Sequence, residues 1–319
     1  MKHPEVHGIG IIGSGMIGCS MAVLTTGHGY PTVNVVRSLA KVPAYRAQYD
    51  EYYREMIAHG VLTEAQYRVC ETYLQYSDDY AALADCEVVF ECIAEDPVQK
   101  HAVYAELEAH CPKLRAICSV SSSLLPDALG EGLEKYADRI VVTHPFHPAH
   151  MVPYMEICGG SKTADGLTEW VKGFLQTLDR KPAILRKPNP GFIGNYLQFA
   201  LWAAALKLVE DGVCAPEDVD TCLEYSFCPR YTSIGIFEHF DHGGYRLNTT
   251  TCANVFPALP RWDGAPEIIR EKAESPDAWG AASPTHLGFY DWNGVDSAAY
   301  QERVNAPYWD FCRWSFPEK

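Results

Sequence analysis

The chain has 319 residues, of which 47% are hydrophobic and 21% are charged, and its formal net charge is -15. This length predicts about two globular domains. The acidic charge excludes the electrostatic footprint of a protein that binds nucleic acid or an anionic membrane. We therefore expect neither as a partner, and a small molecule as the substrate.

Twelve cysteines are spread along the chain without a CxxC pair, so neither a zinc knuckle nor a thioredoxin-like motif is expected. Several lie in apolar runs, as Cys92 does, which is typical of free buried thiols in a reducing compartment. The few residues before the first predicted strand carry no signal-peptide pattern, so we expect a cytoplasmic location. Asn195, Gln198 and Lys207 interrupt the longest apolar stretch, which predicts a buried helix and not a membrane span.

Strands and helices alternate along the first part of the chain, as in a parallel α/β sheet. The pattern predicts strands over 9–12, 32–36, 87–93, 116–119, 140–143, 154–158 and 183–186, and helices over 16–26, 44–83 and 97–110. The segment KPNPGF then breaks the alternation, and an apolar helix over 192–210 follows it. We predict an α/β fold, with a Rossmann-type doubly wound sheet over 1–187 and an all-α substrate and dimerisation domain over 188–319.

The first strand runs into the pattern GxGxxG, formed by Gly13, Gly15 and Gly18. Its position between a strand and a helix is that of the dinucleotide-binding fingerprint. The first glycine permits a tight turn, the second lets the backbone approach a pyrophosphate, and the third lets helix and strand pack closely. With Met16 and Ile17 between them, these residues form the expected cofactor loop, and the alternative is a tight turn without a ligand.

The end of the second strand predicts which cofactor is bound. An NAD site usually has an acidic residue there, which accepts hydrogen bonds from the ribose. This chain has Arg37 followed by Ser38. A guanidinium pairs with a 2′-phosphate, and the hydroxyl adds a donor. We therefore expect NADP to be favoured over NAD, and the alternative is that Arg37 is a solvated surface residue.

A histidine-rich stretch, VVTHPFHPAHMVPYMEICGG, contains the candidate base. His144 ends a predicted strand at the carboxyl edge of the sheet, where ligands of open α/β sheets bind. An imidazole suits the removal of a hydroxyl proton, and the carboxylate of Glu156 can fix its tautomer. A metal site with His147 and His150 is the weaker alternative, because their spacing matches no helical HExxH pattern. We expect no metal.

The segments GIIGSGMIG, FECIAED, SVSSSL, HPFHP…MEI and PGFIGNYLQFAL occur in this order. Together they resemble the 3-hydroxyacyl-CoA dehydrogenase superfamily, nearest its lambda-crystallin, L-gulonate 3-dehydrogenase and carnitine dehydrogenase branch, over residues 7 to about 242. The resemblance implies that His144 and Glu156 are the catalytic pair. It also implies that Ser122 contacts the substrate oxygen and that Asn195 lies near the nicotinamide and the substrate carbonyl.

The resemblance places two further residues, Glu95 and Lys100, close to the cofactor and the catalytic loop. The chain departs from the family at three positions. His147 replaces an asparagine beside the base, Tyr196 replaces an arginine, and Arg37 replaces the aspartate that goes with NAD. The helical domain of the family also forms a homodimer, which we expect here.

Ser122 and Asn195 are uncharged hydrogen-bonding residues that can polarise a carbonyl without competing for the proton. The alternatives are a helix cap before Pro126 for the serine and a buried structural amide for the asparagine.

Acyl-CoA carries phosphates, so its binding usually needs Lys or Arg near the pocket mouth. Residues 45–85 contain three arginines, no lysine and many acidic residues, which argues against CoA. Arg230 offers a bidentate partner for a substrate carboxylate, or else a structural salt bridge. We expect a small free 3-hydroxy acid or its 3-keto partner as substrate. The alternatives are an acyl-CoA, a more elaborate ketone, or a non-catalytic cofactor-binding protein of the crystallin kind.

Overall fold

The computed structural model describes residues 2–274 and 280–316. The chain divides into two compact units, Met1–Gly194 with Gln301–Lys319, and Asn195–Tyr300. The segment that begins at Gln301 therefore packs with the first unit, whereas the sequence-based division placed it in the helical domain.

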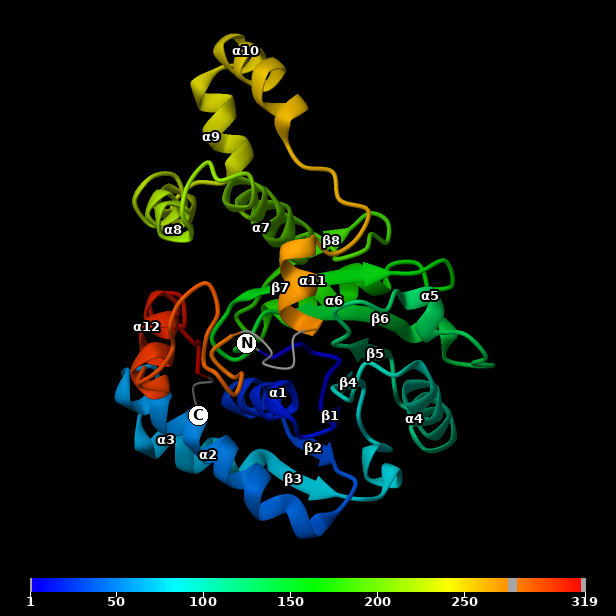
Figure 1. Ribbon diagram of the computed structural model, residues 1–319. Coiled ribbons are helices and arrows are strands. Elements are labelled where there is room, and N and C mark those ends of the chain that lie inside the picture. The colour runs from blue at the N-terminus through cyan, green and yellow to red at the C-terminus, as the bar shows by residue number, and fades with distance from the viewer. Residues whose placement is uncertain (1, 275–279, 317–319) are drawn as a thin grey trace. The chain divides into compact units, whose positions relative to one another are not determined.

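An eight-stranded sheet forms the centre of the first unit (Figure 1), with strand order β3-β2-β1-β4-β5-β6-β7-β8. Neighbouring strands are parallel except β6 and β7, which are antiparallel. The strands are β1 (Ile9–Ile12), β2 (Thr32–Val35), β3 (Leu74–Ser77), β4 (Val88–Glu91), β5 (Ala116–Ser119), β6 (Ile140–Pro145), β7 (Tyr154–Gly159) and β8 (Lys181–Leu185). The predicted Rossmann-type sheet is confirmed.

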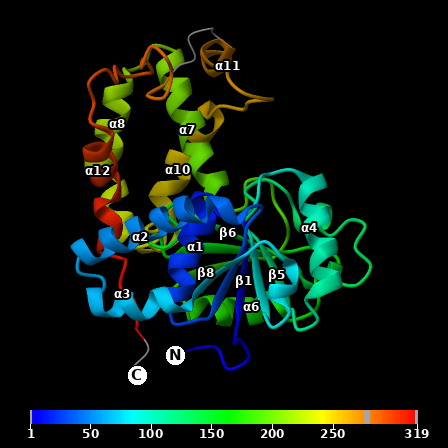
Figure 2. The ribbon, with the colours of Figure 1, turned by 90° about the horizontal axis from the view of Figure 1, so that it is seen from below.

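Helices cover both faces of this sheet, which is why β1, β4 and β5 are buried along their whole length. One hydrophobic core joins the sheet to α1 (Met16–Gly27), α2 (Val42–Ala58), α3 (Glu64–Cys70) and α6 (Leu167–Gln176). A second core joins the other face to α4 (Pro97–His110) and α5 (Pro126–Leu129). Figure 2 shows α1 and α4 on opposite sides of the sheet.

The stretch over 44–83, expected to be helical, contains a strand instead. Helices α2 and α3 occupy its first part, and β3 pairs in parallel with β2 at the edge of the sheet. Only Leu74 of the four β3 residues is buried. A strand this short and this exposed carries little hydrophobic pattern, so its pairing with β2 decides its conformation.

The end of the chain packs on the first unit. Helix α12 (Ser297–Trp309) leads to Trp314, whose ring lies so close to Gly27 that a Cβ there would meet it at 2.1 Å. The backbone N–H of Ser315 donates to the carboxylate of Asp179, which also contacts His28 at 3.2 Å. Although partial burial opposes it, the hydrogen bonds from His28 and Ser315 lower the pKa of Asp179 to about 2.

The second unit consists of helices and turns. Its helices are α7 (Gly194–Glu210), α8 (Pro216–Tyr225), α9 (Ile236–Gly243), α10 (Tyr245–Val255) and α11 (Glu267–Glu274). Helix α7 was expected to be buried, but of its residues only Leu206 is buried within the chain. No helix in the described residues combines the length and the hydropathy needed to cross a membrane.

Candidate functional site

The β6–β7 pair brings His144 and Glu156 together. The two residues are direct partners in the antiparallel register, so their side chains lie on the same face of the sheet. His144 Nδ1 is 2.9 Å from Glu156 Oε2, and both residues are buried. The twelve-residue spacing is therefore that of the end of a strand, a loop and a return strand.

The contact with Glu156 defines the state of the imidazole. A carboxylate accepts a hydrogen bond, so we assign the proton of the neutral ring to Nδ1. This assignment leaves Nε2 as the nitrogen with a lone pair. The ring centroids of Phe146 and Phe192 lie 5.4 Å and 5.6 Å from the centroid of the imidazole ring, so the base has apolar neighbours.

The carboxylate of Glu156 is fully buried and accepts four hydrogen bonds. His144 binds Oε2, while Oε1 accepts from the backbone N–H groups of Ile193 at 2.8 Å and Gly194 at 2.7 Å. The hydroxyl of Tyr154 donates to Oε1 at 3.1 Å. Burial would raise the pKa of Glu156, but the hydrogen bonds from His144, Gly194, Ile193 and Tyr154 outweigh it and lower that pKa. The residue is thus a carboxylate at neutral pH.

A tight turn delivers the two backbone donors. Gly191 and Phe192 have φ of 75° and 51°, a conformation that is uncommon for a residue with a large side chain. The side-chain amide of Asn189 donates to the carbonyl of Phe192 at 3.2 Å and holds this turn. A Cβ at Gly194 would lie 2.3 Å from the ring of Phe146, so a larger residue there would displace that ring. Sequence reasoning recognised KPNPGF as a break between domains and its PGF as part of a family segment, but did not identify these two backbone donors.

The glycine loop has the backbone that the fingerprint requires. Gly13 has φ of 97°, and a Cβ there would lie 2.7 Å from the carbonyl of Cys92. A Cβ at Gly18 would lie 2.2 Å from the carbonyl of Gly13. A Cβ at Gly15, the residue before α1, would meet nothing within 4 Å. The open space beside Gly15 and the first N–H groups of α1, which lack a side-chain cap, fit a dinucleotide pyrophosphate.

A buried side-chain amide forms hydrogen bonds with this glycine loop, and sequence reasoning missed it. Asn34 on β2 donates to the carbonyls of Ile11 and Gly13 and accepts from the hydroxyl of Ser14 at 2.6 Å. A polar residue inside the buried strand TVNV is the signal that could have identified it, because buried amides need partners.

A chain of charges holds the serine turn at the carboxyl edge. Lys100 and Glu91 are both fully buried, and the Lys100 ammonium lies 2.7 Å from Glu91 Oε1. The hydroxyls of Tyr104 and Ser119 also donate to Glu91. Lys100 further lies 3.5 Å from Glu95. Lys100 therefore acts within the protein as a buried counter-charge for these two carboxylates.

Glu95 in turn organises the SVSSSL segment. Its Oε1 accepts from the backbone N–H groups of Ser122 at 3.1 Å and Ser123 at 3.0 Å, and from the hydroxyl of Ser121. Although partial burial opposes it, the hydrogen bonds from Ser121 and Ser123 lower the pKa of Glu95 to about 2. The structure thus brings Ser122, Glu95 and Lys100 together, with Ser122 exposed.

Arg37 follows β2 and is exposed. Its guanidinium donates to the side-chain carbonyl of Gln99 at 2.5 Å, a neutral acceptor. Among the residues that the structure describes, Arg37 forms no ion pair. Ser38 precedes a short 3₁₀ helix, and its side chain does not cap that helix.

The remaining candidates belong to the second unit or have other partners. Asn195 begins the second unit, where Arg230 is exposed and lies 3.2 Å from His239 Nε2. His150 is buried and hydrogen-bonded to Ser20, and burial together with the charge of Arg180 lowers its pKa to about 3. His147 is exposed on the loop after β6. Within the described residues, no three His, Cys, Asp or Glu side chains are arranged to hold a metal ion.

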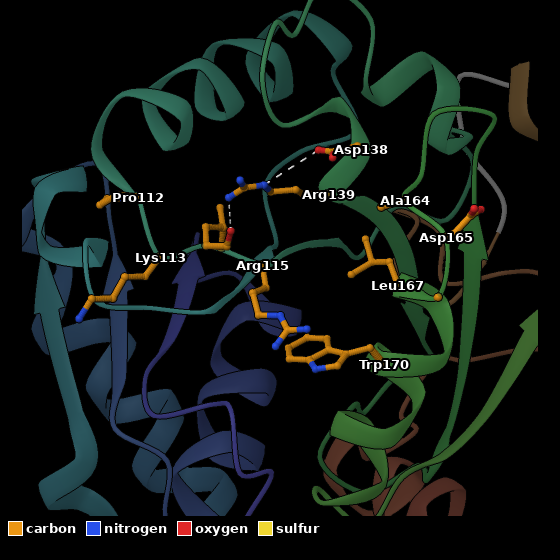
Figure 3. A pocket seen from close by; sticks show the side chains of 11 residues that line it. Pro112, Lys113, Arg115, Asp138, Arg139, Ala164, Asp165, Leu167 and Trp170 are labelled. Carbon is orange, nitrogen blue, oxygen red and sulfur yellow. Dashed lines mark hydrogen bonds and ion pairs between the residues drawn. The ribbon is translucent and has the colours of Figure 1, made fainter.

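A cavity of about 560 Å³ lies at the opposite edge of the sheet, where β5 and β6 begin (Figure 3). Arg115 lies over the ring of Trp170 and pairs with Glu5 at 2.7 Å. Arg139 donates to the carbonyl of Leu114. Because these cations are satisfied by the protein, we assign the chemistry to the edge that carries His144.

Models of two protein-family domains match the chain. The 3-hydroxyacyl-CoA dehydrogenase NAD binding domain matches residues 8–187, and the 3-hydroxyacyl-CoA dehydrogenase C-terminal domain matches residues 191–292.

Individual proteins are also similar. An L-carnitine dehydrogenase of Mesorhizobium japonicum is 31% identical over 192 residues, which cover 60% of this chain and 51% of that protein. The chain thus matches about half the length of that relative. An L-carnitine dehydrogenase of Oceanobacillus iheyensis is 29% identical over 284 residues, 86% of this chain and 88% of that protein.

A solved structure resembles the whole chain. It is that of 5-formyl-3-hydroxy-2-methylpyridine 4-carboxylic acid 5-dehydrogenase, described as an NAD+ dependent dismutase. Its TM-score is 0.85 at 23% identity, with 96% of this chain and 97% of that chain covered. At this identity the likeness concerns the fold alone.

The glycine loop predicts two different outcomes for two similar substitutions. Gly15→Ala should leave the melting temperature within about 1 °C of the wild type, since the new methyl meets no protein atom, but should weaken cofactor binding at least about tenfold. Gly18→Ala should lower the melting temperature by several degrees, because its methyl meets the carbonyl of Gly13. Thermal unfolding and fluorescence titration with NADPH and NADH measure both. Equal cofactor affinity for Gly15→Ala and the wild type would contradict this assignment.

Proposed function

Because the chain belongs to the 3-hydroxyacyl-CoA dehydrogenase family, we propose that it transfers a hydride between NAD(P) and the 3-hydroxyl or 3-keto carbon of a small hydroxy acid. The observation that carries the proposal is the buried His144–Glu156 pair at the carboxyl edge of a sheet whose first turn is a dinucleotide fingerprint.

Alcohol oxidation needs a proton acceptor and a hydride acceptor. The nicotinamide, when bound, supplies the hydride acceptor. His144 Nε2 takes the hydroxyl proton as the carbonyl forms, and Glu156 stabilises the resulting imidazolium through Nδ1. In the reducing direction the imidazolium returns the proton. Ser122 and Asn195 are proposed to donate hydrogen bonds to the substrate oxygen, and the Glu95 contacts hold the backbone of the serine turn.

We propose that NADP is favoured over NAD, although the family model describes an NAD binding domain. The support is the Arg37 guanidinium, which follows β2 with a neutral partner and no ion pair among the described residues. Its charge is therefore available to a 2′-phosphate. Because the residue after β2 is Arg37 and not Asp or Glu, the chain lacks the carboxylate that usually accepts hydrogen bonds from the ribose hydroxyls of NAD.

The substrate is proposed to be a free acid and not an acyl-CoA. The three arginines of residues 45–85 each pair with a carboxylate nearby: Arg46 with Asp50, Arg54 with Glu51 and Arg68 with Glu64, at 2.6–2.7 Å. No cation among them is left for the phosphates of CoA. Arg230 in the second unit is the proposed partner of the substrate carboxylate. L-Carnitine, a 3-hydroxy acid and the substrate in the relatives' names, is the first compound to test.

We propose further that the protein is a cytoplasmic homodimer. Helix α7 exposes large apolar side chains that a second copy would cover: Tyr196, Leu197, Phe199, Leu201, Trp202 and Leu208. Light scattering should give twice the mass of one chain. The cysteines of the chain are free, as suits a reducing compartment.

Replacing the proposed base should separate catalysis from binding. His144→Asn is expected to lower kcat by a factor of about 10² to 10⁴, the usual contribution of a general acid/base, while NADPH affinity stays within about twofold. Steady-state rates and fluorescence titration measure the two quantities. Full turnover in the variant would rule out this mechanism. A wild-type protein that binds the cofactor but turns over no alcohol or ketone would favour the non-catalytic alternative.

The cofactor preference predicts a change in one cofactor only. Arg37→Ala should lower kcat/KM for NADPH by about 10- to 100-fold, because hydrogen bonds to charged groups contribute roughly 1.5–3 kcal/mol, and should leave kcat/KM for NADH nearly unchanged. Arg54→Ala removes a surface arginine of the same unit that is paired with Glu51, so it is the matched control and should change neither value. A wild-type preference for NADH would refute the proposal.

The substrate class can be tested with pairs of compounds. We expect the protein to oxidise L-carnitine or 3-hydroxybutyrate and not 3-hydroxybutyryl-CoA. The absorbance of the reduced nicotinamide cofactor follows the reaction. Arg230→Leu should raise KM for the acid about tenfold or more with little change in kcat. Activity with the CoA ester alone would overturn the free-acid assignment.

A further inference from the structure

Tyr154 belongs to the face of the sheet that carries the base. It lies two residues before Glu156 on β7, so the two side chains point to the same side of the strand. In the β6–β7 register His144 lies opposite Glu156, and the ring of Phe146 lies 5.9 Å from that of Tyr154. The phenol is therefore part of the wall around the His144–Glu156 pair.

The Tyr154 hydroxyl is the only side chain among the three donors to Glu156 Oε1. The other two are the backbone N–H groups of Ile193 and Gly194, which hold the turn before α7. Burial and the charge of Glu156 raise the pKa of Tyr154 well above its ordinary value. The phenol thus remains a neutral donor over the whole range in which a histidine titrates.

We propose that Tyr154 is a positioning residue that sets how strongly Glu156 holds the imidazolium of His144. This inference rests on the proposed function of His144 as the acid/base. A donor on Oε1 withdraws electron density from the carboxylate and makes it a weaker acceptor at Oε2. Tyr154 therefore favours the neutral imidazole, the form that accepts the proton of the alcohol.

The direction of the effect follows from this charge distribution. Without the phenol, the carboxylate becomes more basic and binds the Nδ1–H of the imidazolium more strongly. The protonated ring is stabilised, so His144 takes up its proton at a higher pH. As the pH falls, the variant should therefore lose alcohol oxidation at a higher pH than the wild type does. As the pH rises, it should keep ketone reduction to a higher pH than the wild type does.

The test is the NMR titration of His144 in the full chain, assigned by the signals that disappear in His144→Asn. Tyr154→Phe should raise the titration midpoint of His144 by about 0.5 pH unit, and the acidic midpoint of kcat/KM for L-carnitine oxidation should rise with it. The control is Tyr136→Phe, which removes a buried hydroxyl that donates to the carbonyl of Cys111 in the same unit and should leave the midpoint unchanged.

A second substitution keeps the test possible if Tyr154→Phe folds poorly. A 3-fluorotyrosine placed at position 154 keeps the ring and makes the hydroxyl a stronger donor, so the midpoint should move downward. A midpoint that stays within about 0.1 pH unit in both variants, or that moves equally in Tyr136→Phe, overturns the role of Tyr154. Because the titration needs no turnover, this result is distinct from failure of the proposed function, which full activity of His144→Asn would reveal.

Discussion

The pairing of β6 with β7 is the constraint on which the candidate site depends. It is the antiparallel step in an otherwise parallel sheet, and it sets His144 directly opposite Glu156. A shift of one residue in this register would move Glu156 to the other face and leave the imidazole without its carboxylate. The buried carboxylate of Glu156 would then lack its hydrogen-bond donors. The register that forms the site therefore also provides partners for a buried charge.

Glu156 on β7 connects the base on β6 with the turn before α7. One oxygen holds the imidazole, and the other accepts the N–H groups of Ile193 and Gly194, immediately before Asn195 in the chain. The conformation of the base and that of the turn leading into α7 are therefore linked through one carboxylate. In a second arrangement, Lys100 on α4 pairs with Glu91 on β4 and with Glu95, and Glu95 accepts from the backbone of the serine turn. Both arrangements use a carboxylate to position backbone N–H donors, and Glu156 is buried whereas Glu95 is exposed.

Much of the fold could be predicted from the sequence. The glycine pattern and the alternation of apolar strands with helices predict the Rossmann-type sheet. The positions of His144 and Glu156 on neighbouring predicted strands predict the pair. Residues whose role comes from packing could not be predicted. Strand β3 has too few buried residues for its pattern to show. Asn34 acts through partners that are distant in the sequence, and Tyr154 donates to a carboxylate whose other partners lie on β6 and before α7. The segment after Gln301 gave no sign that it packs on the first unit, because its contacts are with Gly27 and Asp179.

The central claim is that His144 Nε2 exchanges a proton with the substrate oxygen while Glu156 holds Nδ1. A crystal structure with the oxidised cofactor and a hydroxy acid tests it most directly. The account predicts the substrate hydroxyl oxygen within about 3 Å of His144 Nε2 and the Nδ1 contact with Glu156 retained. A substrate oxygen bound elsewhere, or an imidazole turned away from Glu156, would contradict it.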